Sequence, residues 1–465
     1  MDTIETDYLI VGSGASGMAF ADTLLSETSY EFVLTDRRSQ PGGHWVDTYP
    51  FVQLHQPSAY YGVNSVPLGN DTIDTSGVNA GFYERATGAE IQYYYQRVLS
   101  DVFMSSGRVT HRPAHDYLGE EDGAHILRSN LNGDLTRVKV RRSLVDATIT
   151  QSSVPSRHTP SFNIEQGVSF VTPNTLVNVV GARGYTVIGA SKTSMDVCFW
   201  LLQQGVAPDK ITWVRPREVW MGNRASTQPL AMAANMMRAG ALSMQAAAEA
   251  DDANDYALRM EAEDMMFRLD RGQNTPINRG AVISQPELTA LRSIERVVRK
   301  GYVRSIQTTK LIFDQGELTC EPGQVFVDCT AAGLSSASPR PIFEPGKINV
   351  FFTTRGVAPW SAALVGFVES MDVSIEEIIK LCPPLPLSFY MLGILNIMRF
   401  GLEIENLRRS VSELASWSST ARLNPSRSIP DAMRDPQAQA DFATYTKHYP
   451  AALENLNRIC GDAST

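Results

Sequence analysis

The sequence predicts an α/β fold with two βαβ units, the second inserted into the domain that the first begins, and with extra helices at the C-terminal end. Two stretches, residues 8–36 and 185–215, each show an apolar run, a loop of small residues, a helical stretch and a second apolar run. A later segment, residues 324–334, again has features expected of the first domain, and the pattern from residue 371 onward is mostly helical. The 465 residues are enough for two or three such domains.

The loop of the first unit has the sequence G-x-G-x-x-G and includes Ser16. Gly12 permits a tight turn, Gly14 lets backbone approach a pyrophosphate, and Gly17 lets the following helix pack against the strand. The N-terminus of that helix offers free N–H groups to phosphates. Asp36 ends the next apolar run, where a carboxylate can accept a bond from an adenosine ribose hydroxyl and repels a 2′-phosphate. This unit is therefore predicted to bind a dinucleotide that lacks a 2′-phosphate.

The loop of the second unit departs from the glycine pattern at two positions. Gly189 is followed by Ser191 and Ser194, which are small enough for close approach and whose hydroxyls can bond a phosphate oxygen. Lys192 and Thr193 add a positive charge and a further hydroxyl. The loop is not a Walker A motif, because no lysine directly follows a glycine. We interpret it as a second dinucleotide-binding loop.

Arginine, and not an acid, ends the strand of the second unit. Arg215 at this position can fork onto a 2′-phosphate, which favours NADPH over NADH. Arg217 and Arg224 are weaker candidates for the same role. The alternative is that the arginines form a solvated surface cluster.

These patterns predict three segments. Residues 1–180 form the first part of the first dinucleotide domain, residues 181–323 the second domain with a helical insertion, and residues 324–465 a return segment with C-terminal helices. The stretch 107–150 is strand-rich, whereas the Ala-, Met-, Glu- and Arg-rich stretch 226–300 is interpreted as helical.

A glycine pair followed by an aromatic residue identifies a family. Gly42-Gly43-His44-Trp45, a few residues past Asp36, resembles the G-G-x-W segment of flavin-containing monooxygenases and related FAD oxidoreductases. The segments at 144–148 and 327–334 resemble that family's strands ending in A-T-G, although the first lacks the glycine. The family fingerprint F-x-G-x-x-x-H is absent, so the chain resembles a divergent member of the wider group.

The resemblance implies the cofactors and the reaction. FAD is expected on the first unit and NADPH on the second, with hydride passing from NADPH to FAD. The reduced flavin then forms a C4a-hydroperoxide with O2 and inserts one oxygen atom into a small organic substrate. The further cofactor-binding residues expected on this basis are Arg37, Gly43, His44, Trp45, Gln53, Ala331 and Gly333.

Two residues are candidates for contact with the reacting edge of the flavin. His55 precedes Pro57 at the spacing of an asparagine in the family's N-x-P context, and Gln56 lies between them. A hydrogen-bond donor that also manages a proton near neutral pH suits the oxygenated flavin. The alternative for His55 is a loop histidine without a catalytic role.

Two other functions stay open. The protein can instead be a FAD- and NADPH-dependent reductase, dehydrogenase or oxidase without oxygenation, although the absence of C-x-x-C argues against a disulfide reductase. The serine substitutions in the second loop also leave room for a nucleotide-binding protein without turnover.

Composition excludes several other classes. The net charge is −9 without a long basic run, which argues against a nucleic-acid partner. The N-terminus lacks the features of a signal peptide, and prolines interrupt the apolar stretch 381–400, so we expect a cytoplasmic protein without stable membrane insertion. The five scattered cysteines indicate neither a metal site nor a redox dithiol. We expect a monomer or homodimer with no metal.

Overall fold

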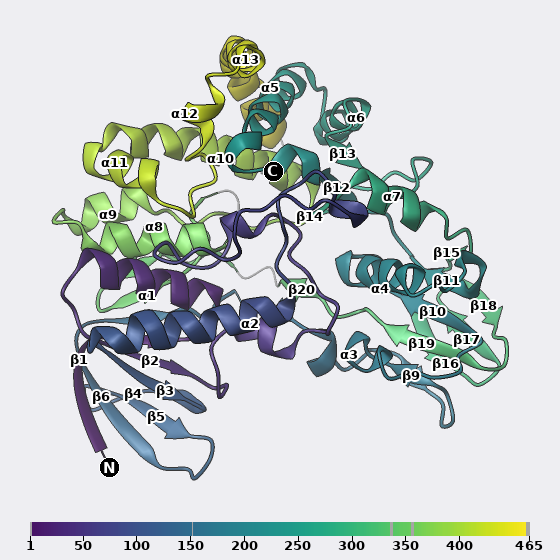
Figure 1. Ribbon diagram of the computed structural model, residues 1–465, viewed down its shortest axis with the longest axis horizontal. Coiled ribbons are helices and arrows are strands. Elements are labelled where there is room, and N and C mark those ends of the chain that lie inside the picture. Colours follow the sequence, from purple (N-terminus) through teal and green to yellow (C-terminus); the bar gives the residue numbers. More distant parts are fainter. Residues whose placement is uncertain (1, 151, 335–337, 355–357, 462–465) are drawn as a thin grey trace.

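The fold is built on two mainly parallel sheets that lie side by side, with the C-terminal helices above them (Figure 1). The computed structural model describes residues 2–150, 152–334, 338–354 and 358–461. Each sheet contains one of the βαβ units predicted from the sequence. The predicted α/β class, the two Rossmann-like units and the extra C-terminal helices are confirmed.

The first sheet has the strand order β21-β22-β6-β1-β2-β3. The strands from β22 to β3 are parallel, and β4 and β5 extend the sheet from β6 as antiparallel strands. Leu127 of β5 packs on Leu9 and Val33, so this extension covers one face of the sheet. The strands are β1 (Asp2–Val11), β2 (Phe32–Asp36), β3 (Val109–Pro113), β4 (His115–Glu121), β5 (Ala124–Ser129), β6 (Leu135–Asp146), β21 (Phe343–Glu344) and β22 (Lys347–Asn349).

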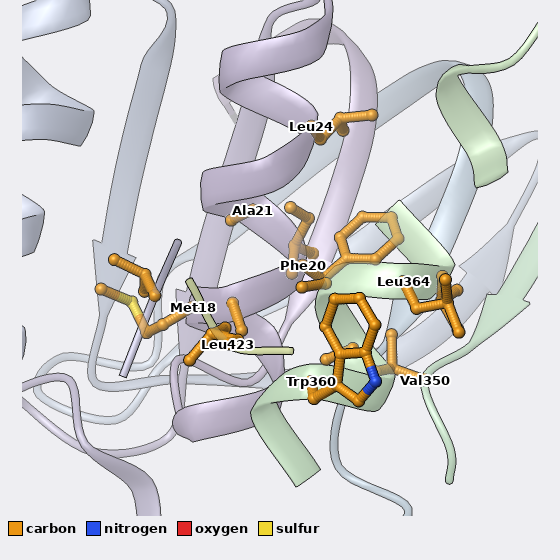
Figure 2. Close-up of a cluster of buried hydrophobic side chains, with 14 of the residues drawn as sticks. Met18, Phe20, Ala21, Leu24, Val350, Trp360, Leu364 and Leu423 are labelled. Atoms are coloured by element: carbon orange, nitrogen blue, oxygen red, sulfur yellow. The ribbon is translucent and has the colours of Figure 1, made fainter. Parts of the chain in front are cut away.

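Two helices from opposite ends of the chain cover the other face of this sheet. α1 (Ala15–Glu27) packs against α8 (Ala358–Ser370), and their side chains form the largest apolar cluster with Val350 and Leu423 (Figure 2). Gly366 allows the close approach, because a Cβ there would lie 3.0 Å from the carbonyl oxygen of Phe20. Residues 17–25 of α1 are all buried, because the first sheet covers one side of the helix and α8 covers another.

The second sheet has the order β15-β11-β10-β19-β9, and all its neighbours are parallel. Its strands come from residues 170–328, so the sheet extends beyond the segment 181–323 that was expected to form the second domain. The strands are β9 (Phe170–Val171), β10 (Gly184–Ile188), β11 (Ile211–Val214), β15 (Val297–Val298) and β19 (Gln324–Asp328). A smaller four-stranded sheet packs beside it, made of β8 (Asn163–Ile164), β16 (Val303–Ile306), β17 (Lys310–Phe313) and β18 (Gly316–Thr319).

The strand at residues 324–328 corrects one expectation. We expected the chain to return to the first domain near Asp328, but β19 pairs with β10 in the second sheet. A short apolar run shows that a strand is buried but not which sheet contains it. The chain crosses between the domains just afterwards, where β20 (Gly333–Leu334) pairs with β7 (Ser152–Ser153).

The insertion at residues 226–300 is only partly helical. α5 (Ala234–Glu249), α6 (Ala253–Ala262) and α7 (Gln285–Arg292) are present as expected. The same region contributes β13 (Met266–Phe267) and β14 (Asn278–Ile283), which pair with β12 (Trp220–Asn223). The purely helical interpretation was therefore wrong for residues 266–283, where tertiary pairing decides the backbone conformation.

The remaining helices complete the fold. α13 packs on α5 and closes the helical end of the molecule (Figure 1). They are α2 (Gly88–Arg97), α3 (Pro173–Leu176), α4 (Lys192–Gln203), α9 (Ile375–Leu381), α10 (Met391–Ser410), α11 (Ser412–Thr420), α12 (Ile429–Ala432) and α13 (Pro436–Gly461). None of the helices in the described parts of the chain is long and apolar enough to cross a membrane.

The contact between α1 and the first glycine loop yields a stability prediction. A Cβ at Gly17 would overlap the carbonyl oxygen of Gly12, which is backbone and cannot turn aside. Gly17→Ala should therefore lower the free energy of unfolding by roughly 1–3 kcal/mol or more, measured by denaturant titration. The control is Gly401→Ala within α10, where a Cβ meets no atom within 4 Å and should add roughly 0.5–1 kcal/mol. Equal stability of Gly17→Ala and the wild type would contradict this packing.

Candidate functional site

A cavity of about 700 Å3 lies where the loops of the two βαβ units face each other. Such loops follow the carboxyl ends of parallel strands, the usual position of dinucleotide sites. The cavity brings together most of the residues predicted from the sequence. These are Gly12, Gly14, Ser16, Asp36, Arg37, Gly43, His44, Trp45, Gln53, His55, Gln56, Ser191, Lys192, Thr193, Ala331 and Gly333.

The floor of the cavity is bare backbone. A Cβ on Gly43 would lie 2.8 Å from Cα of Gly14, so the two glycine segments touch through their main chains. The amide of Gly42 donates to the carbonyl of Ser13 at 2.9 Å, which fixes the second segment against the first. The first turn of α1 has no side-chain cap, so its N–H groups stay open to a ligand. This cradle fits a pyrophosphate.

Asp36 ends β2 and both lines the cavity and anchors the first loop. Its Oδ2 accepts from the amide and the hydroxyl of Ser13, at 2.7 and 3.1 Å, and its Oδ1 accepts from the amide of Arg38 at 2.9 Å. A carboxylate has about four acceptor sites, so one remains for a ribose hydroxyl. The carboxylate thus has a structural role that the sequence did not reveal.

Trp45 forms a wall of the cavity, and its orientation is fixed. Its indole N–H donates to the hydroxyl of Tyr61 at 2.7 Å, and the ring of His44 lies on it with centroids 5.1 Å apart. Burial and the charge of Arg38 lower the pKa of His44 to about 4, against the opposing effect of Asp47. His44 is therefore neutral near pH 7.

The segment with His55 and Gln56 lines the cavity from the first domain. Arg224 holds its backbone, because Nε donates to the carbonyl of His55 at 2.8 Å. Burial, followed by the charges of Lys192, Arg224 and Arg85, keeps the pKa of His55 well below its ordinary value. Within the described ranges, neither the imidazole of His55 nor the amide of Gln56 forms a hydrogen bond, so both groups are available to a ligand.

The second domain presents the N-terminus of α4 to the cavity. Ser191 occupies the N-cap position of this helix without a side-chain capping bond, and Lys192 and Thr193 line the cavity with it. Lys192 forms a close ion pair with Asp196, which also accepts from the hydroxyl of Tyr49 at 2.7 Å. The helix therefore contacts the first domain directly.

Two residues of the second loop serve packing and not a ligand. The hydroxyl of Ser194 is buried and donates to the carbonyl of Ser191 at 2.7 Å, so it does not reach a phosphate as we had expected. A Cβ on Gly189 would lie 2.6 Å from the carbonyl oxygen of Cys329. Gly189 therefore allows close packing against the end of β19, just as Gly17 allows α1 to pack closely against the first glycine loop.

The three predicted arginines do not line the cavity. Arg215 ends β11 as expected but is buried beside Glu218, with Nη2 3.3 Å from its carboxylate. Arg224 is fully buried, and its Nη2 lies 2.5 Å from Oε2 of Glu287. Arg217 is exposed. The sequence led us to expect that Arg215 and Arg224 bind the 2′-phosphate, but it could not show that Glu218 and Glu287 pair with them.

Sequence reasoning missed Arg38 and Arg279, two cationic residues that line the cavity. Arg279 of β14 donates to the carbonyl of Ala332 at 2.7 Å, and its guanidinium lies 4.5 Å from the ring centroid of Phe389. Burial, together with the charge of Arg217, lowers the pKa of Arg279. No motif marks Arg279, because it lies in a stretch whose composition is typical of helices.

Apolar side chains form the wall beside Arg279, and the sequence pattern did not reveal them either. They come from β12, β14 and the segments before α8 and α10, which are far apart in the chain. They are Val219, Trp220, Ala281, Phe352 and Phe389.

Comparisons with known proteins agree with this arrangement. The family model described as an NAD(P)-binding Rossmann-like domain matches residues 10–69. The uncharacterized proteins Rv2000 of Mycobacterium tuberculosis and Mb2023 of Mycobacterium bovis are each 39% identical over 427 residues, which cover 91% of this chain and 78% of theirs.

Solved structures with a similar fold are monooxygenases. The open crystal structure of cyclohexanone monooxygenase aligns with a TM-score of 0.50 and 14% identity over 88% of this chain and 93% of that one. Steroid monooxygenase bound to NADP aligns with a TM-score of 0.50 and 13% identity over 79% and 85%. At this identity the likeness shows the fold, which confirms the resemblance drawn from the motifs at that level.

The pKa of His44 gives a prediction for stability against pH. The folded-state pKa of about 4 lies below the ordinary 6.5, so its contribution is present above pH 6.5 and is lost as the pH falls toward 4. Between pH 7 and pH 5 the wild type should lose about 2 kcal/mol more of its free energy of unfolding than His44→Gln. Denaturant titrations at both pH values measure this difference. Parallel losses in the two proteins would contradict a strongly lowered pKa.

Proposed function

Because the chain belongs to one family with the mycobacterial protein Rv2000 and has the fold of the flavin monooxygenases, we propose that it is a FAD- and NADPH-dependent monooxygenase. One observation carries the proposal. The N-termini of α1 and α4, one from each Rossmann-like unit, open into the same cavity. Two dinucleotides held there have their reactive rings within one shared space.

The first unit suits FAD. The backbone of Gly12, Gly14 and Gly43 leaves room for the pyrophosphate, and Asp36 offers an acceptor to the ribose. Trp45 and the backbone at Gly333 lie along the remaining length of the cavity. When bound, FAD and NADPH supply hydride transfer and the activation of O2.

The second unit suits NADPH. Ser191, Lys192 and Thr193 provide N–H groups, hydroxyls and a positive charge for the pyrophosphate. We assign the 2′-phosphate to the exposed Arg217, because Arg215 is already paired with Glu218. Arg215 then stiffens the strand end from which Arg217 projects.

The substrate is expected to be a small organic molecule with an apolar body. The wall formed by Val219, Trp220, Ala281, Phe352 and Phe389 excludes water and takes such a body. Arg279 lies at the edge of this wall and stabilises negative charge that develops in the cavity. Neutral His55 and the amide of Gln56 donate hydrogen bonds there, and the lowered pKa of His55 argues against the proton-managing role near neutral pH that the sequence led us to expect.

Two substitutions test the two proposed dinucleotide sites one at a time. Ser16→Asp places a negative charge at the start of α1, and Ser191→Asp places one at the start of α4; both are favourable for the helices themselves. Ser16→Asp should weaken FAD at least about tenfold, and Ser191→Asp should weaken NADPH by a similar factor, because each repels phosphates. Flavin fluorescence and NADPH titration measure the two affinities.

The control is Ser374→Asp at the exposed N-terminus of α9, which should leave both affinities unchanged. If Ser16→Asp affected only NADPH, or Ser191→Asp only FAD, the assignment of the units would be reversed. If neither changed an affinity, the cavity would not be the dinucleotide site.

His55 is expected to limit the wasteful loss of hydrogen peroxide. His55→Ala removes a donor from the cavity and should raise NADPH oxidation with peroxide release, in the absence of substrate, roughly tenfold. His55→Asn keeps an N–H donor and should restore part of the coupling. Wild-type peroxide release from His55→Ala would exclude this role.

A further inference from the structure

A buried group of five charged side chains lies behind the cavity, where α4 and α7 meet the first domain. Its members are at most 15% exposed, and two are carboxylates. The group, here called the charge cluster, consists of Arg85, Lys192, Asp196, Arg224 and Glu287.

The charge cluster has one positive charge more than its carboxylates neutralise. Lys192 pairs with Asp196, and Arg224 pairs with Glu287 at 2.5 Å. Arg85 reaches Glu287 only at 3.7 Å, although its side chain is 7% exposed. Its terminal nitrogens donate to neutral oxygens of the 53–54 segment at 3.2 Å, and within the described residues its Nε has no partner. Burying a cation with so weak an anionic partner is costly.

A second cavity of about 240 Å3 adjoins the cluster. Arg85, Lys192, Asp196 and Glu287 line its polar side. Its other side is apolar and partly aromatic, and two of these rings, Phe51 and Trp200, stack with centroids 4.7 Å apart. The apolar lining consists of Phe51, Val78, Phe199 and Trp200.

This cavity is distinct from the dinucleotide site but lies next to it. Among the residues that the structure describes, only Gln53 and Lys192 line both cavities. Gln53 and Gln203 at its rim are exposed, so a ligand can enter from solvent. The cavity is too small for a dinucleotide and suits a compact molecule.

We propose that the second cavity binds a small organic carboxylate. The carboxylate lies beside Arg85 and Lys192 and balances the extra positive charge, and the apolar body lies against Phe51 and Trp200. An inorganic anion would satisfy the charge but leave the aromatic wall without a contact. A neutral molecule would contact the aromatic wall but leave Arg85 without a close anionic partner.

The site shares Gln53 and Lys192 with the proposed monooxygenase site but is otherwise lined by different residues and takes a different ligand. A ligand here also reduces the positive potential that Lys192 and Arg85 exert on His55. The binding test needs no turnover, so it stands whether or not the chain oxygenates a substrate.

Calorimetric titration of the full-length protein with benzoate tests the proposal. Benzoate should bind one to one, and benzyl alcohol and inorganic phosphate should each bind at least about tenfold more weakly. Arg85→Gln should weaken benzoate roughly 30-fold. Arg434→Gln is the matched control, because this arginine is 85% exposed, lines neither cavity and should leave binding unchanged.

A second variant guards against a general effect of Arg85→Gln on folding. Val78→Phe fills the cavity, keeps every charge and should also abolish benzoate binding. Saturating FAD should leave benzoate affinity unchanged, because the glycine segments and Asp36 proposed to hold FAD do not line the second cavity. Equal binding of benzyl alcohol or phosphate, binding that survives Val78→Phe, competition by FAD, or no benzoate binding would each overturn the proposal.

Discussion

The site depends on backbone-to-backbone packing of Gly14 against Gly43. A Cβ on Gly43 would lie 2.8 Å from Cα of Gly14 and would push the second segment away from the first. With both glycines present, the amide of Gly42 bonds to Ser13, and Asp36 ties Ser13 to the end of β2. The same packing carries the chain from Gly43 into Trp45 and onward to the segment that contacts α4. One close contact thus sets both the phosphate cradle and the position of the second domain.

The two domains use the same local solution twice. Gly12 and Gly189 each lie against the end of a neighbouring strand, where a Cβ would meet Ala147 and Thr148 in one case and Cys329 in the other. At both strand ends a carboxylate closes the turn, because Asp146 accepts from Thr148 and Asp328 accepts from Thr330. The repeated geometry leaves each helix N-terminus open. Because the two units face each other, the N-termini of α1 and α4 open into one shared cavity.

The local parts of this arrangement were predictable from the sequence, and the long-range parts were not. The glycine loop, Asp36 and the Gly-Gly-His-Trp segment lie between residues 12 and 45 and have fixed spacings, so the pattern alone predicted that they lie together. Arg215 is buried beside Glu218, which Arg299 also approaches from far along the chain, and Arg224 is buried beside Glu287, 63 positions away. Arg279 and Phe389 come together only because the segment before α10 pairs beside β14. Strand β14 itself escaped notice because its neighbours in the sequence are helical.

The central claim is that one cavity holds FAD and NADPH so that one reduces the other. The most direct measurement is anaerobic titration of the FAD-loaded protein with NADPH and, separately, NADH, followed by flavin absorbance. The account predicts that NADPH bleaches the flavin and does so at lower concentration than NADH, and that oxygenated buffer restores the colour. A protein that fails to take up FAD, or a bound flavin that neither nucleotide bleaches, would contradict the account.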